Sequence, residues 1–175
     1  MRKSSRTGCL IALICVAILR PLAPAAAQAP ASQATEAAAP VRSAGQFLYL
    51  PVYSNVWHGE LDRSGRPQKT LVSVLVSIRN ADPTRSIRVT SARYHDTAGK
   101  LVREYVTAAQ TVGPLATLEL FVQRTDDSGG SGASFVIAWS AERSVNAPVV
   151  EALHMDTPAG RPIVFTTRAR PISLD

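Results

Sequence analysis

Cysteine, methionine and long apolar runs are scarce in this 175-residue chain, and each scarcity excludes a class of site. Both cysteines, Cys9 and Cys15, precede residue 28, so the rest of the chain has no disulfide, thiol nucleophile or thiolate metal ligand. Beyond Met1 the only methionine is Met155, which excludes a methionine-rich copper site. No apolar run reaches the roughly 20 residues that a membrane-spanning helix needs.

The first residues follow the three-part pattern of a bacterial signal peptide. Three cations and no acid stand before residue 7, an apolar run of 11 residues occupies 9–19, and small residues end at Ala27. We expect a signal peptide over 1–27, cleavage near Ala27/Gln28, and a periplasmic protein that meets the membrane only transiently. An uncleaved anchor formed by the same residues stays open as the alternative.

The basic character of the chain lies partly in that segment. The chain has 19 lysines and arginines against 13 aspartates and glutamates. Four of the cations and none of the acids lie in residues 1–27, which leaves the exported part with a net charge of +2. Its arginines are spread along the sequence rather than clustered, so we expect no nucleic-acid partner.

Two further ranges follow the signal peptide. Residues 28–45 are rich in alanine and proline and poor in large apolar side chains, so we expect a disordered linker. Residues 46–175 have the length of one domain. We see no internal repeat and expect a monomer.

The apolar residues of that domain recur with a period of two. In residues 70–79, for example, Val72, Val74, Val76 and Ile78 share one face. This alternation is typical of β-strands, and helical patterns longer than two turns are absent. Strands are predicted at 47–54, 70–79, 87–96, 101–106, 116–123, 134–139, 148–155 and 162–168. A break in the alternation predicts a β-bulge near Ser91.

These strands and the turns between them predict an all-β fold, an antiparallel β-sandwich of about seven or eight strands. The immunoglobulin-like arrangement is the expected subtype, without the cysteine pair that antibody domains carry. Trp139 follows Phe135 and Ile137 at period two, so it is predicted to lie in the core.

Four segments, in this order, resemble a known family. They are YLPVYS at 49–54, SIRNAD at 77–82, YHD at 94–96 with GKLVR at 99–103, and SGGSGASF at 128–135. The order resembles the bacterial family known as domain of unknown function 3124, over about residues 47–170. The resemblance implies an exported or envelope-associated β protein, and it carries over no activity and no functional residue.

Three histidines are the only residues that suggest an enzyme. His58, His95 and His154 stand far apart, on three different predicted strands or strand ends. A hydrolase or metal-dependent enzyme would need the fold to bring them together, since metal ligands on one element are closely spaced. We therefore nominate no catalytic or metal-binding residue and expect no cofactor.

The loop at 126–132 is a candidate contact surface, with Asp126, Asp127, Ser128 and Ser131 as its polar residues. Its two adjacent acids do not match a calcium loop, which needs spaced oxygen ligands and a closing glutamate. A phosphate-binding loop would lead into a helix, whereas a strand follows here. The simpler interpretation is a flexible connection between two strands.

The second candidate surface contains Tyr53, Trp57 and His58. Exposed aromatic side chains with polar tips suit contacts with proteins or carbohydrates. The same side chains could instead fill the core or close one end of the sandwich, and the sequence leaves this open. The sequence thus predicts a non-catalytic binding or interaction module of the cell envelope, whose partner is an envelope protein or a glycan.

Overall fold

Strands and the turns between them make up the computed structural model, which describes residues 41–158 and 160–174. These residues belong to one compact unit, Ala38–Asp175. The predicted signal peptide, its cleavage site and most of the predicted linker lie outside the described residues. Within the described part, no helix has the length and apolar character to cross a membrane.

One sheet has six strands, and every neighbouring pair in it is antiparallel. Its path is β12–β1–β9–β5–β6, and β7 also pairs with β5. The strands are β1 (Arg42–Pro51), β5 (Ile87–His95), β6 (Leu101–Glu104), β7 (Gln110–Val112), β9 (Ser134–Asn146) and β12 (Arg170–Ile172). β1 begins inside the range expected for the linker, because Arg42 pairs with Asn146 of β9.

The second sheet has four antiparallel strands in the order β11–β10–β4–β8. They are β4 (Ser73–Arg79), β8 (Thr117–Val122), β10 (Val149–Asp156) and β11 (Ile163–Arg168). The chain passes from this sheet to the other at Ala169, between β11 and β12. The backbone N–H of Ala169 donates to the carbonyl oxygen of Val150 (3.0 Å), which fixes the crossing at this edge.

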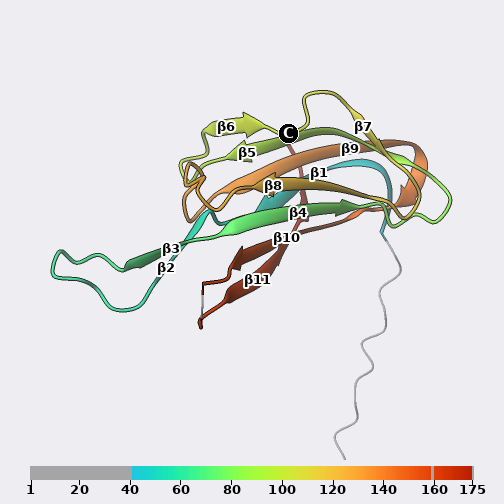
Figure 1. Ribbon diagram of the computed structural model, residues 1–175. Coiled ribbons are helices and arrows are strands. Elements are labelled where there is room, and N and C mark those ends of the chain that lie inside the picture. The colour runs from blue at the N-terminus through green and yellow to red at the C-terminus, as the bar shows by residue number, and fades with distance from the viewer. Residues whose placement is uncertain (1–40, 159, 175) are drawn as a thin grey trace, which may run out of the picture. The chain divides into compact units, whose positions relative to one another are not determined.

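A third, two-stranded sheet is a hairpin of β2 (Asn55–His58) and β3 (Gln68–Leu71). Figure 1 shows this hairpin projecting from the body of the sandwich. The loop that joins its strands, residues 59–67, is almost entirely exposed.

The inward faces of the two large sheets share one apolar core. Val74, Val76 and Ile78 of β4 are fully buried, as their shared face predicts, and Trp139 of β9 is only 3% exposed. Burial of such side chains is the main favourable term in folding. Their partners in the core include Leu48, Leu50, Ile87, Val89, Tyr94, Leu120, Val122, Phe135, Ile137, Val150 and Ala152.

The predicted all-β, disulfide-free antiparallel sandwich is confirmed, and each of the eight predicted ranges overlaps a strand. The strand order is compatible with the immunoglobulin-like subtype, which stays a prediction. Four more strands, β2, β3, β7 and β12, have only three or four residues each, too few to show a period of two. The predicted bulge is confirmed, because the pairing of β5 with β9 shifts register between Val89 and Ser91.

Candidate binding surface

The two segments nominated from the sequence lie against each other. Asp127, in the 126–132 loop, accepts a hydrogen bond from Asn55 Nδ2 (2.6 Å) at the base of the hairpin. The same carboxylate forms an ion pair with Lys69 of β3. In addition, Ser54 N–H donates to the carbonyl oxygen of Gly130 (3.0 Å). The loop therefore fixes the base of the projecting hairpin.

Trp57 occupies the exposed face of this hairpin. Its side chain is 50% exposed, which settles the open question of whether it fills the core. Lys69, its cross-strand partner, places its ammonium nitrogen 5.7 Å from the centre of the indole ring. His58 lies on the opposite face, exposed, with Nε2 2.8 Å from the hydroxyl oxygen of Thr70.

The tip of the hairpin is ordered by Asp62. One carboxylate oxygen of Asp62 accepts hydrogen bonds from the N–H groups of Ser64 (2.8 Å) and Arg66 (3.0 Å) and from the Ser64 hydroxyl (2.6 Å). These hydrogen bonds lower the pKa of Asp62, and the one from the Ser64 hydroxyl has the largest effect. Leu61, beside it, is 66% exposed. The tip thus presents an apolar side chain on a turn closed by its own hydrogen bonds.

Tyr53 does not belong to this exposed surface. Its ring is half-buried and packs edge-on against His154 of β10 and Phe165 of β11, with both centroid distances 5.6 Å. Its backbone N–H donates to Nε2 of His154 (3.1 Å). Of the three residues nominated together, Trp57 and His58 lie on the hairpin, whereas Tyr53 precedes it and packs on the four-stranded sheet.

His154 is fully buried and lies parallel to the Phe165 ring, 4.4 Å between centroids. Burial lowers its pKa from 6.5 to about 4, because the imidazolium form would lose its hydration. The accepted hydrogen bond from Tyr53 requires a lone pair on Nε2, which only the neutral ring has. His154 is therefore a neutral core residue.

The 126–132 loop is tied down rather than a loose connection, which corrects the sequence interpretation. Thr97 N–H donates to the carbonyl oxygen of Gly129 (2.9 Å), and Gly132 N–H donates to the Thr97 hydroxyl (3.0 Å). A Cβ on Gly129 would lie 1.9 Å from the hydroxyl oxygen of Tyr94, so only glycine lets the loop approach the sandwich this closely. The loop packs through its backbone, which is why its lack of apolar side chains misled the prediction.

Two other polar residues of the loop, Asp126 and Ser128, form hydrogen bonds with each other. Asp126 accepts hydrogen bonds from the backbone N–H and the hydroxyl of Ser128. Ser131 is half-buried. Of the four nominated loop residues, Asp127 is the one that reaches the hairpin.

The three histidines lie on three different sheets. His58 is in the hairpin, His95 ends β5 in the six-stranded sheet, and His154 is in β10 of the four-stranded sheet. Among residues 41–158 and 160–174, no group of three or more His, Cys, Asp or Glu side chains could hold a metal ion. The alternative of a hydrolase or metal-dependent enzyme gains no support from this arrangement.

The structure also contains a second surface, which the sequence did not predict. Arg85, Arg88 and Arg143 seemed scattered, yet they line one cleft on the six-stranded sheet. A local signal was the pair of polar residues after a strand, Asn80 and Asp82, which are buried and form hydrogen bonds with the backbone of Arg85. Pairing between strands far apart in sequence brings the arginines together, so their spacing along the chain could not reveal it.

Comparison with known proteins places the chain in a family but assigns no activity. Among curated proteins, none matches it. It is similar to a solved structure described as "Crystal Structure of Thermotoga maritima 1070", with 10% identity over 71% of this chain and 92% of that one. The TM-score of 0.41 is too low to carry an argument. The model of the family described as "Protein of unknown function (DUF3124)" matches residues 45–172, and the chain therefore belongs to the DUF3124 family.

Proposed function

We propose that this protein is an exported, non-catalytic interaction module of the cell envelope that binds a partner protein through its β2–β3 hairpin. The observation that carries the proposal is the half-exposed Trp57 on a projecting hairpin. Tryptophan is enriched among the few residues that dominate binding energy at protein interfaces, together with arginine and tyrosine.

The hairpin is already ordered in the free protein. Its base is held by Asp127, and its tip is closed by Asp62. Binding through a surface that is already ordered avoids much of the entropy cost of arranging loops and side chains. Trp57 and Leu61 can therefore contribute apolar contact area while the hairpin keeps its shape.

Charged side chains of both signs surround the apolar residues of the hairpin. The exposed tip carries Arg63 and Arg66 in addition to Lys69, against Glu60 and Asp62. Because Asp127 pairs with Lys69, the other four charges balance one another around the apolar residues. Such a mixture of an apolar centre and a charged rim is typical of protein interfaces.

The experiment is photo-crosslinking in the envelope of the producing cells, with a photoreactive amino acid placed at Leu61. We expect one recurrent protein adduct, and Trp57→Ala should weaken its formation about 30-fold, as expected for a residue worth roughly 2 kcal/mol at an interface. The matched control is Phe121→Ala on β8, whose side chain is 54% exposed, and it should leave the adduct unchanged. Loss of the adduct in both variants, or no protein adduct at all, would argue against the hairpin as a protein-binding element.

Export is tested separately, at the amino terminus. The start of the chain supports cleavage after Ala27. Amino-terminal sequencing of protein recovered from the periplasm should therefore begin at Gln28. Protein that begins at residue 1 or stays in the cytoplasmic fraction would contradict the proposal for localisation while leaving the hairpin interaction to its own test.

A further inference from the structure

A cleft with a volume of about 590 Å³ lies on the outer face of the six-stranded sheet. Its floor is one cross-strand row, in which Arg88 of β5 stands opposite Thr111 of β7 and Ser140 of β9. Arg88 points outward because its neighbours Ile87 and Val89 are fully buried on the other face. The volume is in the range of sites for small molecules, roughly 300–1,000 Å³.

An irregularity in β9 forms one wall of the cleft. Gly45 of β1 pairs with Ser140, but Ser43, only two residues away, pairs with Val145. The extra residues of β9 therefore bulge from the sheet and carry Glu142 and Arg143 to the cleft. Bulges of this kind are over-represented beside functional sites because they redirect side chains.

The opposite wall is held by a buried polar network. Asp82, buried at the end of the sandwich, accepts hydrogen bonds from the N–H groups of Thr84 (3.0 Å), Arg85 (3.0 Å) and Asn146 (3.2 Å). The Thr84 N–H is the main reason that the pKa of Asp82 falls to about 2. Asn80 Nδ2 adds a bond to the carbonyl oxygen of Arg85 (2.8 Å). The network joins the segment before β5 to the end of the β9 bulge, so the two walls are fixed relative to each other.

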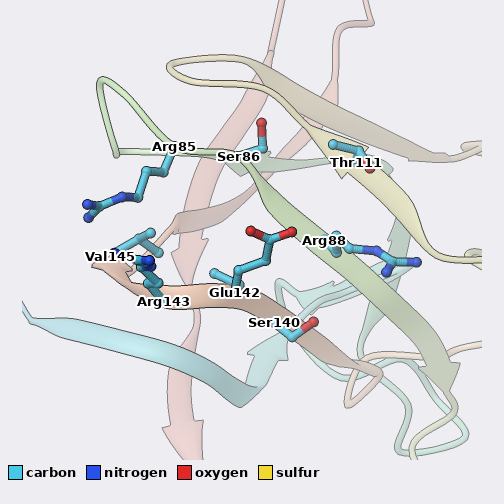
Figure 2. A pocket seen from close by; sticks show the side chains of 9 residues that line it. Arg85, Ser86, Arg88, Thr111, Ser140, Glu142, Arg143 and Val145 are labelled. Carbon is cyan, nitrogen blue, oxygen red and sulfur yellow. The ribbon is translucent and has the colours of Figure 1, made fainter.

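The arginines of the cleft carry charges that no carboxylate of the described residues neutralises through an ion pair. Four arginines outside it are in ion pairs with carboxylates, namely Arg79, Arg93, Arg124 and Arg168. Within the part of the chain that the structure describes, Arg85, Arg88 and Arg143 form no ion pair. In Figure 2 the Glu142 carboxylate lies between Arg85 and Arg143 on one side and Arg88 on the other, and the guanidinium groups of Arg85 and Arg88 point away from it.

This set of groups has a definite chemical complement. Guanidinium groups bind phosphate through paired, charge-assisted hydrogen bonds. Glu142 would repel a bare anion but would accept hydrogen bonds from hydroxyl groups, and the Ser86, Thr111 and Ser140 hydroxyls can both donate and accept. A ligand with a phosphate at one end and several hydroxyl groups beside it satisfies both requirements.

We propose that the cleft between β5, β7 and the β9 bulge binds a phosphorylated saccharide. The phosphate lies against Arg88, the exposed side chains of Arg85 and Arg143 turn toward it from the two walls, and sugar hydroxyl groups donate to Glu142. The site shares no residue with the β2–β3 hairpin and does not depend on the function proposed for that hairpin.

The test is isothermal titration of the full-length protein with glucose 1-phosphate, inorganic phosphate and glucose, at low ionic strength. We expect glucose 1-phosphate to bind more tightly than either of the others. Arg88→Gln should weaken its binding at least about 10-fold, the usual effect of losing a charge-assisted contact. Arg85→Gln provides a second variant with an exposed side chain, in case Arg88→Gln disturbs the sheet.

Glu142→Gln gives an effect in the opposite direction. It should tighten the binding of inorganic phosphate several-fold, since it removes a repelling carboxylate, and should reduce the preference for glucose 1-phosphate over phosphate. The matched control is Arg168→Gln on β11, which removes the same charge from the other sheet and should change affinity less than about twofold. No binding of glucose 1-phosphate at about 10 mM would overturn the proposal. An equal loss in the Arg88 and Arg168 variants would do the same, since it would show attraction by net charge alone.

Discussion

Mild acidification should destabilise this protein, because His154 is held neutral in the core. Its pKa is lowered from 6.5 to about 4 by burial, so between these values the unfolded chain binds a proton that the folded protein does not. Stability therefore rises with pH across this window and is lost as the pH falls through it. The full effect is about 3 kcal/mol below pH 4, and about 2 kcal/mol is already lost at pH 5.

The perturbation that isolates this effect is His154→Gln. A glutamine can place its side-chain oxygen where Nε2 accepts the Tyr53 N–H, but it does not titrate. The free energy of unfolding is measured by urea titration at pH 7.5 and at pH 5, with tryptophan fluorescence as the signal. We expect wild type to lose about 2 kcal/mol more than the variant over this interval, whatever the variant's stability at pH 7.5.

Other titrating groups are present in both proteins and cancel in this comparison. Asp82, whose pKa is lowered to about 2, loses its contribution only below its ordinary value of 3.8, outside the measured interval. An NMR titration of wild type supplies a second measurement, in which the His154 ring should stay neutral down to pH 5. Equal losses in wild type and variant, or a His154 ring that titrates near 6.5, would refute the assignment of this residue to the dry core.

Three smaller predictions follow from packing and exposure. Gly129→Ala should destabilise the fold by roughly 1–3 kcal/mol in thermal unfolding, since the new Cβ would overlap the buried hydroxyl of Tyr94. The control Gly113→Ala, whose Cβ would enter open space, should leave the stability nearly unchanged. In Trp57→Phe the remaining tryptophan is the buried Trp139, so the emission maximum should shift to shorter wavelength and the fluorescence should resist quenching by acrylamide. An unshifted emission maximum would contradict the exposures of the two tryptophans. Glu151→Gln, which breaks two exposed arginine pairs on the four-stranded sheet, should cost no more than about 1 kcal/mol, and a larger loss would show that the pairs act as a network.

Local sequence determined the strands of this protein because alternation is a property of neighbouring residues. Val74, Val76 and Ile78 face one way in any extended chain, and the same rule placed Trp139 in the core. It could also have placed His154, which has the parity of Val150 and Ala152 on β10, all three buried. The period of two thus predicts which side chains share a face, and glycine and proline predict where strands end.

Tertiary structure alone decided which surfaces those faces form. Trp57 is exposed because β2 and β3 leave the sandwich as a hairpin, and the loop that carries Asp127 meets that hairpin across more than 50 residues of sequence. Arg88 and Arg143 share a cleft because β5 pairs with β9, and because β9 bulges where β1 does not. Such contacts depend on long-range pairing and register, which a period of two leaves undetermined, because any strand of the right parity satisfies the same local pattern.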